Sequence, residues 1–202
     1  MATADCRRSE VFGAMNRVAT PDDKRLREAQ CENLQPVAEV HRNPWFSVCD
    51  RGGRFTVEYH QRQVSVLPVV DGKSVVMVRP KRPVLDDCPL EFPAGGVEGT
   101  ETAAAAAARE LFEETGIGPI AVDRFVGLPP IGTAPNRTPV LGAIFRVDLT
   151  SAEFESRGNS DDEVVAVENF VIDELRQLVT RWWDLRHATA FDVTSLLSER
   201  TE

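Results

Sequence analysis

Residues 91–117 have the sequence EFPAGGVEGTETAAAAAARELFEETGI, and this stretch decides how the rest of the chain is interpreted. Its run of six alanines favours a helix, which we predict over residues 102–115. Glu110, Glu113 and Glu114 have the i, i+3 and i+4 spacing that places side chains on one helix face, where like charges repel. A hard divalent cation removes that repulsion because it accepts carboxylate oxygens. The stretch therefore predicts a metal site on this helix.

The residues around the three glutamates fit the same prediction. Arg109 can hold one carboxylate in place, and Gly95 lets the preceding loop turn tightly enough to bring a backbone carbonyl to the metal. Glu101 lies at the helix start, within reach of the same cluster. The alternative is an ordinary solvated helix face, which does not explain the combined spacing of the glycines, glutamates and arginine.

This spacing resembles the signature of the Nudix family, the Nudix box, at every fixed position of Gly95-x5-Glu101-x7-Arg109-Glu110-Leu111-x-Glu113-Glu114-x-Gly116-Ile117. Members of that family hydrolyse nucleoside diphosphates linked to another moiety and use Mg²⁺ or Mn²⁺. The resemblance implies an α+β fold, a Nudix α/β/α sandwich with a mixed β-sheet, here with an N-terminal extension. It also implies that Gly95, Arg109 and Gly116 are structural members of the box.

A metal-assisted mechanism assigns a role to each acidic residue of the box. Glu110 and Glu114 bind the metal directly, and the Ala94 carbonyl is a third protein ligand. Glu113 bridges to a second metal or orients a water, and Glu101 acts through water or supports the loop. We expect between one and three ions of Mg²⁺ or Mn²⁺, since both suit carboxylate and water ligands. The ions neutralise the diphosphate and lower the pKa of a bound water.

Three segments that lie outside the Nudix box, apart from Gly95, resemble the branch of ADP-ribose pyrophosphatases and nucleotide-sugar hydrolases: Glu91-Phe92-Pro93-Ala94-Gly95, Val78-Arg79-Pro80-Lys81-Arg82 and Ser160-Asp161-Asp162-Glu163-Val164-Val165. By this resemblance Arg82 and Arg79 bind phosphate, and Glu91 belongs to the substrate site. Glu163 is the expected base that takes a proton from the attacking water, with Asp162 as the second choice. The alternatives are surface arginines and a solvated acidic turn.

One loop departs from that branch. ADP-ribose hydrolases often carry acidic residues there, whereas residues 128–137, LPPIGTAPNR, contain no carboxylate. Asn136 and Arg137 indicate a different sugar or terminal group. The expected products are a nucleoside monophosphate and a phosphorylated remainder, such as a sugar phosphate. The alternative function is a catalytically silent Nudix-like module that senses a nucleotide, although such modules usually lack one or more box glutamates.

The chain of 202 residues is predicted to hold an N-terminal extension over 1–44, partly disordered, and one domain over 45–202. Asp71-Gly72 predicts a hairpin turn. Thr100 or Thr102 is expected to cap the helix, and Gly116 to end it. A polar loop is expected over 150–162. The other predicted elements are strands at 47–50, 54–60, 64–70, 74–80, 121–128, 140–149 and 164–171, and helices at 173–185 and 190–198.

The amino-acid composition of the chain limits the classes of partner and the compartment that we expect. The net charge of -9 argues against nucleic-acid binding, which needs basic side chains for the phosphates. No apolar run approaches the roughly 20 residues of a membrane span, and the first residues lack the apolar run of a secretory signal. The four cysteines form no C-x-x-C pair, which favours a cytoplasmic protein with reduced thiols. The Nudix resemblance further implies a homodimer, formed through the strands at 45–60.

Overall fold

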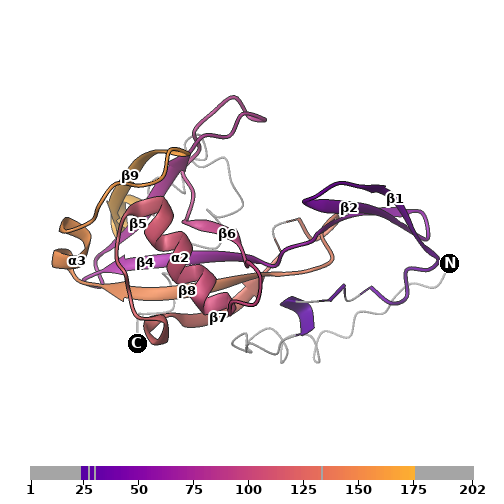
Figure 1. Ribbon diagram of the computed structural model, residues 1–202, viewed down its shortest axis with the longest axis horizontal. Coiled ribbons are helices and arrows are strands. Elements are labelled where there is room, and N and C mark those ends of the chain that lie inside the picture. The colour runs from indigo at the N-terminus through magenta and orange to yellow at the C-terminus, as the bar shows by residue number, and fades with distance from the viewer. Residues whose placement is uncertain (1–23, 27, 30, 133, 176–202) are drawn as a thin grey trace.

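The computed structural model describes residues 24–26, 28–29, 31–132 and 134–175. In chain order its elements are η1 (Lys24–Leu26), β1 (Val37–Arg42), β2 (Phe46–Arg51), β3 (Arg54–Tyr59), β4 (Gln63–Val70), β5 (Ser74–Pro80), β6 (Ala94–Gly96), α2 (Ala103–Thr115), η2 (Val122–Arg124), β7 (Val126–Ile131), β8 (Gly142–Leu149), α3 (Ser151–Glu155) and β9 (Val164–Val171). The strands form two sheets, a large one that carries α2 and a small one made of β1 to β3 (Figure 1). None of the helices in the described ranges has the length and apolar character needed to cross a membrane.

The large sheet has six strands and is mixed. Its order is β7-β8-β4-β5-β9, with β6 paired to β4. β4 and β8 run parallel, from Val64 opposite Ala143 to Val70 opposite Leu149, and the other pairs of this sheet are antiparallel. The expected α+β class with a mixed sheet is confirmed.

Residues 91–96 lie between β4 and β5. These two strands pair with each other only near their turn, where Val70 faces Ser74. Further along, β6 pairs with the start of β4, and Glu91 forms a β-bridge with Val78 of β5. The loop that precedes α2 is therefore held by backbone hydrogen bonds on both sides, which fixes the position from which the helix begins.

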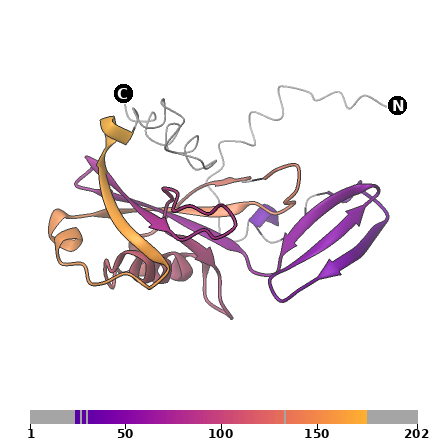
Figure 2. The same ribbon diagram turned by 90° about the horizontal axis from the view of Figure 1, so that it is seen from above.

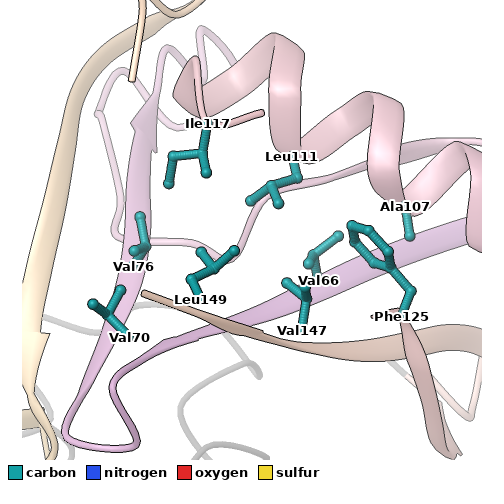
Figure 3. Close-up of a cluster of buried hydrophobic side chains, with 9 residues drawn as sticks. All are labelled: Val66, Val70, Val76, Ala107, Leu111, Ile117, Phe125, Val147 and Leu149. Atoms are coloured by element: carbon teal, nitrogen blue, oxygen red, sulfur yellow. The ribbon is translucent and has the colours of Figure 1, made fainter. Parts of the chain in front are cut away.

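One face of the large sheet packs against α2. The helix contributes Ala107 and Leu111, and Ile117 follows its end (Figure 3). They meet a layer of buried apolar side chains from the sheet and from the end of η2: Val66, Val70, Val76, Phe125, Val147 and Leu149. Because interiors are closely packed, this contact fixes the rotation of α2 and thus the direction in which its glutamates project.

β4 and β5 are buried on both faces, so successive side chains enter two clusters. Val66 and Val70 face α2, whereas the next cluster comprises Leu67, Val69, Val75, Met77, Leu90, Phe92 and Leu175. Near-continuous apolar runs are typical of strands covered on both sides. Residues 172–175 are helical, where a helix is predicted over 173–185; the rest of that helix and the one at 190–198 lie outside the described residues.

The small sheet lies beside the large one (Figure 2) and is joined to it by the β7–β8 loop, where the N–H of Val57 donates to the carbonyl oxygen of Arg137 at 2.8 Å. β1 is absent from the sequence prediction because its six residues are exposed and show no alternation of buried and exposed positions. β1 pairs with β2, so the two strands lie on either side of residue 44, where the sequence analysis divides the chain into an extension and a domain. That division stays a prediction.

Two predicted segments are wrong in detail. The strand expected over 121–128 is a 3-10 turn followed by β7, which continues through Pro129 and Pro130. Prolines are tolerated there because β7 is an edge strand whose register shifts between Leu128 and Ile131. The polar loop expected over 150–162 contains α3, which is nucleated by a Thr150–Glu153 capping box.

Candidate active site

Helix α2 carries the glutamates and has well-defined ends. The Thr102 hydroxyl accepts a hydrogen bond from the Ala105 N–H at 3.1 Å, and Gly116 ends the helix with φ 69°. A β-carbon on residue 116 would also lie 2.6 Å from the carbonyl carbon of Gly158. Glycine is therefore required both for the left-handed cap and for the close approach of the loop at 158–163, which we call the acidic loop. The predicted capping by Thr102 and Gly116 is confirmed.

Arg109 holds much of the box together. One guanidinium nitrogen donates to Glu110 and to Glu113, each at 2.8 Å. The other donates to Glu101 at 2.9 Å and to the Gly96 carbonyl at 2.7 Å. These hydrogen bonds raise the pKa of Arg109 and keep it charged, and the bond with Glu101 makes the largest contribution. Arg109 thus links the start, the middle and the preceding loop of α2.

Glu110 is buried against the loop before the helix. A β-carbon on residue 95 would lie 2.5 Å from its Oε2 atom, and nearer still to Oε1, so any side chain at that position would displace the Glu110 carboxylate. Burial raises the pKa of Glu110, although the hydrogen bond from Arg109 opposes that rise. The buried Glu110 carboxylate therefore lies directly against the backbone at Gly95.

Glu114 is the most strongly perturbed acid of the site. Its Oε2 atom accepts a hydrogen bond from the Ala94 N–H at 3.0 Å. Burial raises its pKa to about 8, and the nearby carboxylates of Glu110 and Asp161 add to the rise. Without a cation the charged form of Glu114 is therefore disfavoured, and a cation nearby would stabilise it.

The donor atoms fit a divalent metal, although the side chains are not arranged around one. Across the described part of the chain, no three His, Cys, Asp or Glu side chains are grouped closely enough to hold a metal ion. Glu101 and Glu113 are instead turned to Arg109, which also binds Glu110. Glu110 and Glu114 supply the hard carboxylate oxygens that Mg²⁺ and Mn²⁺ bind, and burial raises the pKa of both, which a cation would reverse. The Ala94 carbonyl stays a predicted ligand.

The acidic loop lies against the end of α2. The N–H of Gly158 donates to Gly116 O at 2.9 Å, and that of Asp161 donates to Glu113 O at 2.8 Å. The Asp161 carboxylate in turn accepts from the N–H of Glu163 at 3.0 Å. The predicted bases, Asp162 and Glu163, are exposed in the same loop.

The structure brings Arg82 to this site. It forms a two-pronged ion pair with the buried Glu91, with distances of 3.0 and 2.7 Å. These bonds raise its pKa, and the charges of Glu114 and Glu163 contribute, so both acids lie within electrostatic reach. Arg79 is held differently, since it bonds the Glu168 side chain on β9 and the Cys88 carbonyl.

A cavity of about 520 Å³ opens beside Arg82. Its lining comprises Lys81, Arg82, Pro83, Val84, Leu85, Asp162 and Glu163. Lys81 and Asp161 belong to segments that the sequence analysis names, but neither is given these contacts there. Their contacts depend on strand and loop pairing far apart in the chain, so no local signal marks them. A small molecule in this cavity would have both cationic and acidic groups within reach.

Comparison with known proteins gives consistent matches. Residues 59–191 match the model of the NUDIX domain family. The chain is 30% identical over 120 residues to the ADP-ribose pyrophosphatase of Bacillus subtilis (strain 168), covering 59% of this chain and 63% of that one. It is 47% identical over 57 residues to the ADP-sugar pyrophosphatase of Mus musculus, 26% of each chain. The matches thus span less than two thirds of either relative's length.

A solved structure supports the fold. The structure described as an ADP compounds hydrolase has a TM-score of 0.56 and 19% sequence identity, and the likeness covers 80% of this chain and 90% of that one. Together with the family match, this likeness confirms the expected α/β/α sandwich fold.

Proposed function

This chain belongs to the Nudix family, and from that premise we propose that it hydrolyses the diphosphate of a nucleoside diphosphate linked to another moiety. The products are a nucleoside monophosphate and a phosphorylated remainder. The observation that carries this proposal is the pair of carboxylates on α2, the buried Glu110 and the partly buried Glu114, with Arg82 within electrostatic reach of Glu114. Acids that are costly to ionise beside a phosphate-binding arginine favour a metal–diphosphate site.

The metal would be held by Glu110 and Glu114, with the Ala94 carbonyl as a third ligand. Glu113 and Glu101 are available for further ions or for bound waters, once the contacts with Arg109 rearrange. When bound, Mg²⁺ or Mn²⁺ offsets the charge of the diphosphate and makes water a better nucleophile. We propose between one and three ions, as in the sequence prediction.

The protein's own side chains complete the reaction. Arg82 donates to the phosphate oxygens, and Glu91 keeps its guanidinium in position. Arg79 is a second candidate for phosphate binding, provided that it leaves Glu168. Glu163 takes a proton from the water that attacks phosphorus, and Asp162 is the alternative base. Both acids line the cavity beside Arg82, which fits this arrangement.

ADP-ribose or a nucleotide sugar is the proposed substrate. The names of the two curated relatives, an ADP-ribose pyrophosphatase and an ADP-sugar pyrophosphatase, favour this class. The loop at 128–137 lacks carboxylates and touches β3 through Arg137, so the terminal group can differ from that of typical ADP-ribose hydrolases.

We also propose a homodimer in the cytoplasm. The small sheet and its β1–β2 connection expose the apolar side chains of Val37, Val40, Trp45, Phe55 and Tyr59, and Trp45 is 72% accessible to solvent. Exposed apolar side chains are common at protein–protein interfaces. Cys31, Cys49 and Cys88 are free thiols, which fits a reducing compartment.

A substrate panel tests the function. The protein is incubated with Mg²⁺ and ADP-ribose, ADP-glucose, GDP-mannose, UDP-glucose, diadenosine polyphosphates, NADH or nucleoside triphosphates, and phosphate is measured after phosphatase coupling. We expect turnover of at least one diphosphate-linked compound and much less of the triphosphates. Tight nucleotide binding without turnover of any compound would instead indicate a sensor module.

A further inference from the structure

The acidic loop is attached to the rest of the protein from two sides. On the α2 side, the N–H groups of Gly158 and Asp161 donate to backbone carbonyls at the helix end, at 2.9 and 2.8 Å. On the β5 side, Lys81 makes two contacts with the loop. Its N–H donates to Glu163 O at 2.9 Å, and its ammonium donates to Asp162 O at 2.6 Å. Lys81 therefore holds the backbone of the two residues that carry the proposed bases.

The local strand geometry explains how Lys81 reaches the loop. The β5–β9 register shifts between Arg79 and Pro80, so that Pro80 faces Val164 rather than the residue next in register. Such a bulge bends the strand and redirects the residues after it. Lys81 follows directly, and its long side chain reaches the Asp162 carbonyl while its own N–H bonds to Glu163.

The two attachments fix different parts of the loop. The Asp161 carboxylate accepts from the N–H of Glu163 and of Val164, so the donors of the turn are satisfied within the loop. The carbonyl groups of Asp162 and Glu163 are bonded by Lys81. Since the ammonium bond is charge-assisted, it is the stronger kind of hydrogen bond. Removing it frees the Asp162 carbonyl and leaves the backbone bond from Lys81 to Glu163 as the contact described on that side.

We propose that Lys81 is a positioning residue, which holds the acidic loop so that Glu163 or Asp162 can accept a proton from the attacking water. This inference rests on the proposed hydrolysis and adds a residue to it. Lys81 also lines the cavity beside Arg82, where it could instead bind substrate directly. The two roles differ in their kinetic effect, because a positioning residue acts on the chemical step and a binding residue acts on substrate affinity.

Steady-state kinetics separate these roles. Lys81→Met should lower kcat roughly 10- to 100-fold, as small misplacements of a catalytic group do, with little change in KM. Lys81→Arg should recover part of the loss because it keeps a cationic donor. Lys73→Met, which removes the same charge from the β4–β5 turn, should behave as the wild type. A rise in KM without a fall in kcat would overturn the proposal.

A double-mutant cycle identifies the group on which Lys81 acts. If Lys81 works by placing Glu163, then adding Lys81→Met to Glu163→Gln should lower the residual kcat no further. The same cycle with Asp162→Asn tests the other base. Losses that multiply in both cycles would contradict a positioning role.

Amide hydrogen exchange of the peptide that spans residues 158–164 tests the same contact without any substrate. Lys81→Met should speed exchange in this peptide, where Asp161, Glu163 and Val164 N–H groups are bonded. Lys73→Met should leave it unchanged. Unaltered exchange in Lys81→Met would overturn the proposal even if the enzyme is active, and faster exchange would support the contact even if the proposed hydrolysis fails.

Discussion

Gly95 lies so close to Glu110 that a β-carbon on residue 95 would come within 2.5 Å of the Oε2 atom. The φ of Gly95 is not positive, so alanine would strain contacts rather than backbone there. Gly95→Ala should displace the Glu110 carboxylate and lower kcat by roughly 100-fold. The matched variant is Gly96→Ala, whose β-carbon would meet the side chain of the exposed Gln61, which can move away. Equal losses of activity in the two variants would contradict this role of Gly95.

Arg109 should be intolerant of lysine. A lysine ammonium cannot reproduce the two-nitrogen contact that joins Glu101, Glu110, Glu113 and the Gly96 carbonyl. Arg109→Lys should lower the free energy of unfolding by about 2 kcal/mol, since bonds to charged groups are lost at a partly exposed site. Urea denaturation measures the change. Arg157→Lys, at an exposed arginine near α3, serves as the control. An equal loss of unfolding free energy in that variant would contradict the prediction.

The raised pKa of Glu114 predicts a pH-dependent stability in metal-free protein. Its value moves from 4.5 to about 8, so between these values the folded protein holds a proton that the unfolded chain releases. Stability should therefore fall as pH rises through that interval.

Thermal unfolding in EDTA at pH 5 and pH 9 checks this. At pH 9, Glu114→Gln should melt higher than the wild type by roughly 5 °C, and the gap should shrink at pH 5. Adding Mg²⁺ at pH 9 should raise the melting temperature of the wild type more than that of the variant. Parallel pH profiles for the two proteins would show that Glu114 is not the perturbed group.

The small sheet should form the dimer interface. Trp45, between β1 and β2, has 72% of its surface exposed, and Phe55 on β3 is 53% exposed. Changing both to glutamate should place charge at two exposed apolar positions of this part of the chain and convert a dimer to a monomer. Light scattering during size-exclusion chromatography measures the mass. A wild-type monomer at micromolar concentration would contradict the dimer, and a dimeric double variant would place the interface elsewhere.

The parts of the fold that local signals specify are predictable from the sequence. Helix α2 begins after Thr102 and ends at Gly116, as capping chemistry requires. The hairpin at Asp71 and Gly72, both at positive φ, follows from the same kind of local preference.

What the sequence misses depends on pairing between distant segments. No local sequence pattern marks the insertion of residues 91–96 between β4 and β5. The same holds for β1, whose six residues are all exposed. Spacing places Glu110 and Glu114 on one helix face, but their burial, and hence their raised pKa, depends on the loop that covers them. The same limit applies to the arginines, since spacing does not distinguish Arg82, held by Glu91, from Arg79, held by Glu168.

Metal-dependent hydrolysis at Glu114 is tested most directly by the turnover of the best substrate of the panel in Mg²⁺, compared among the wild type, Glu114→Gln and Glu155→Gln. Glu155 is an exposed acid on α3 and controls for the loss of one charge. We predict that Glu114→Gln loses roughly a thousandfold in kcat while remaining folded, and that Glu155→Gln matches the wild type. A Glu114→Gln variant as active as Glu155→Gln would contradict the account.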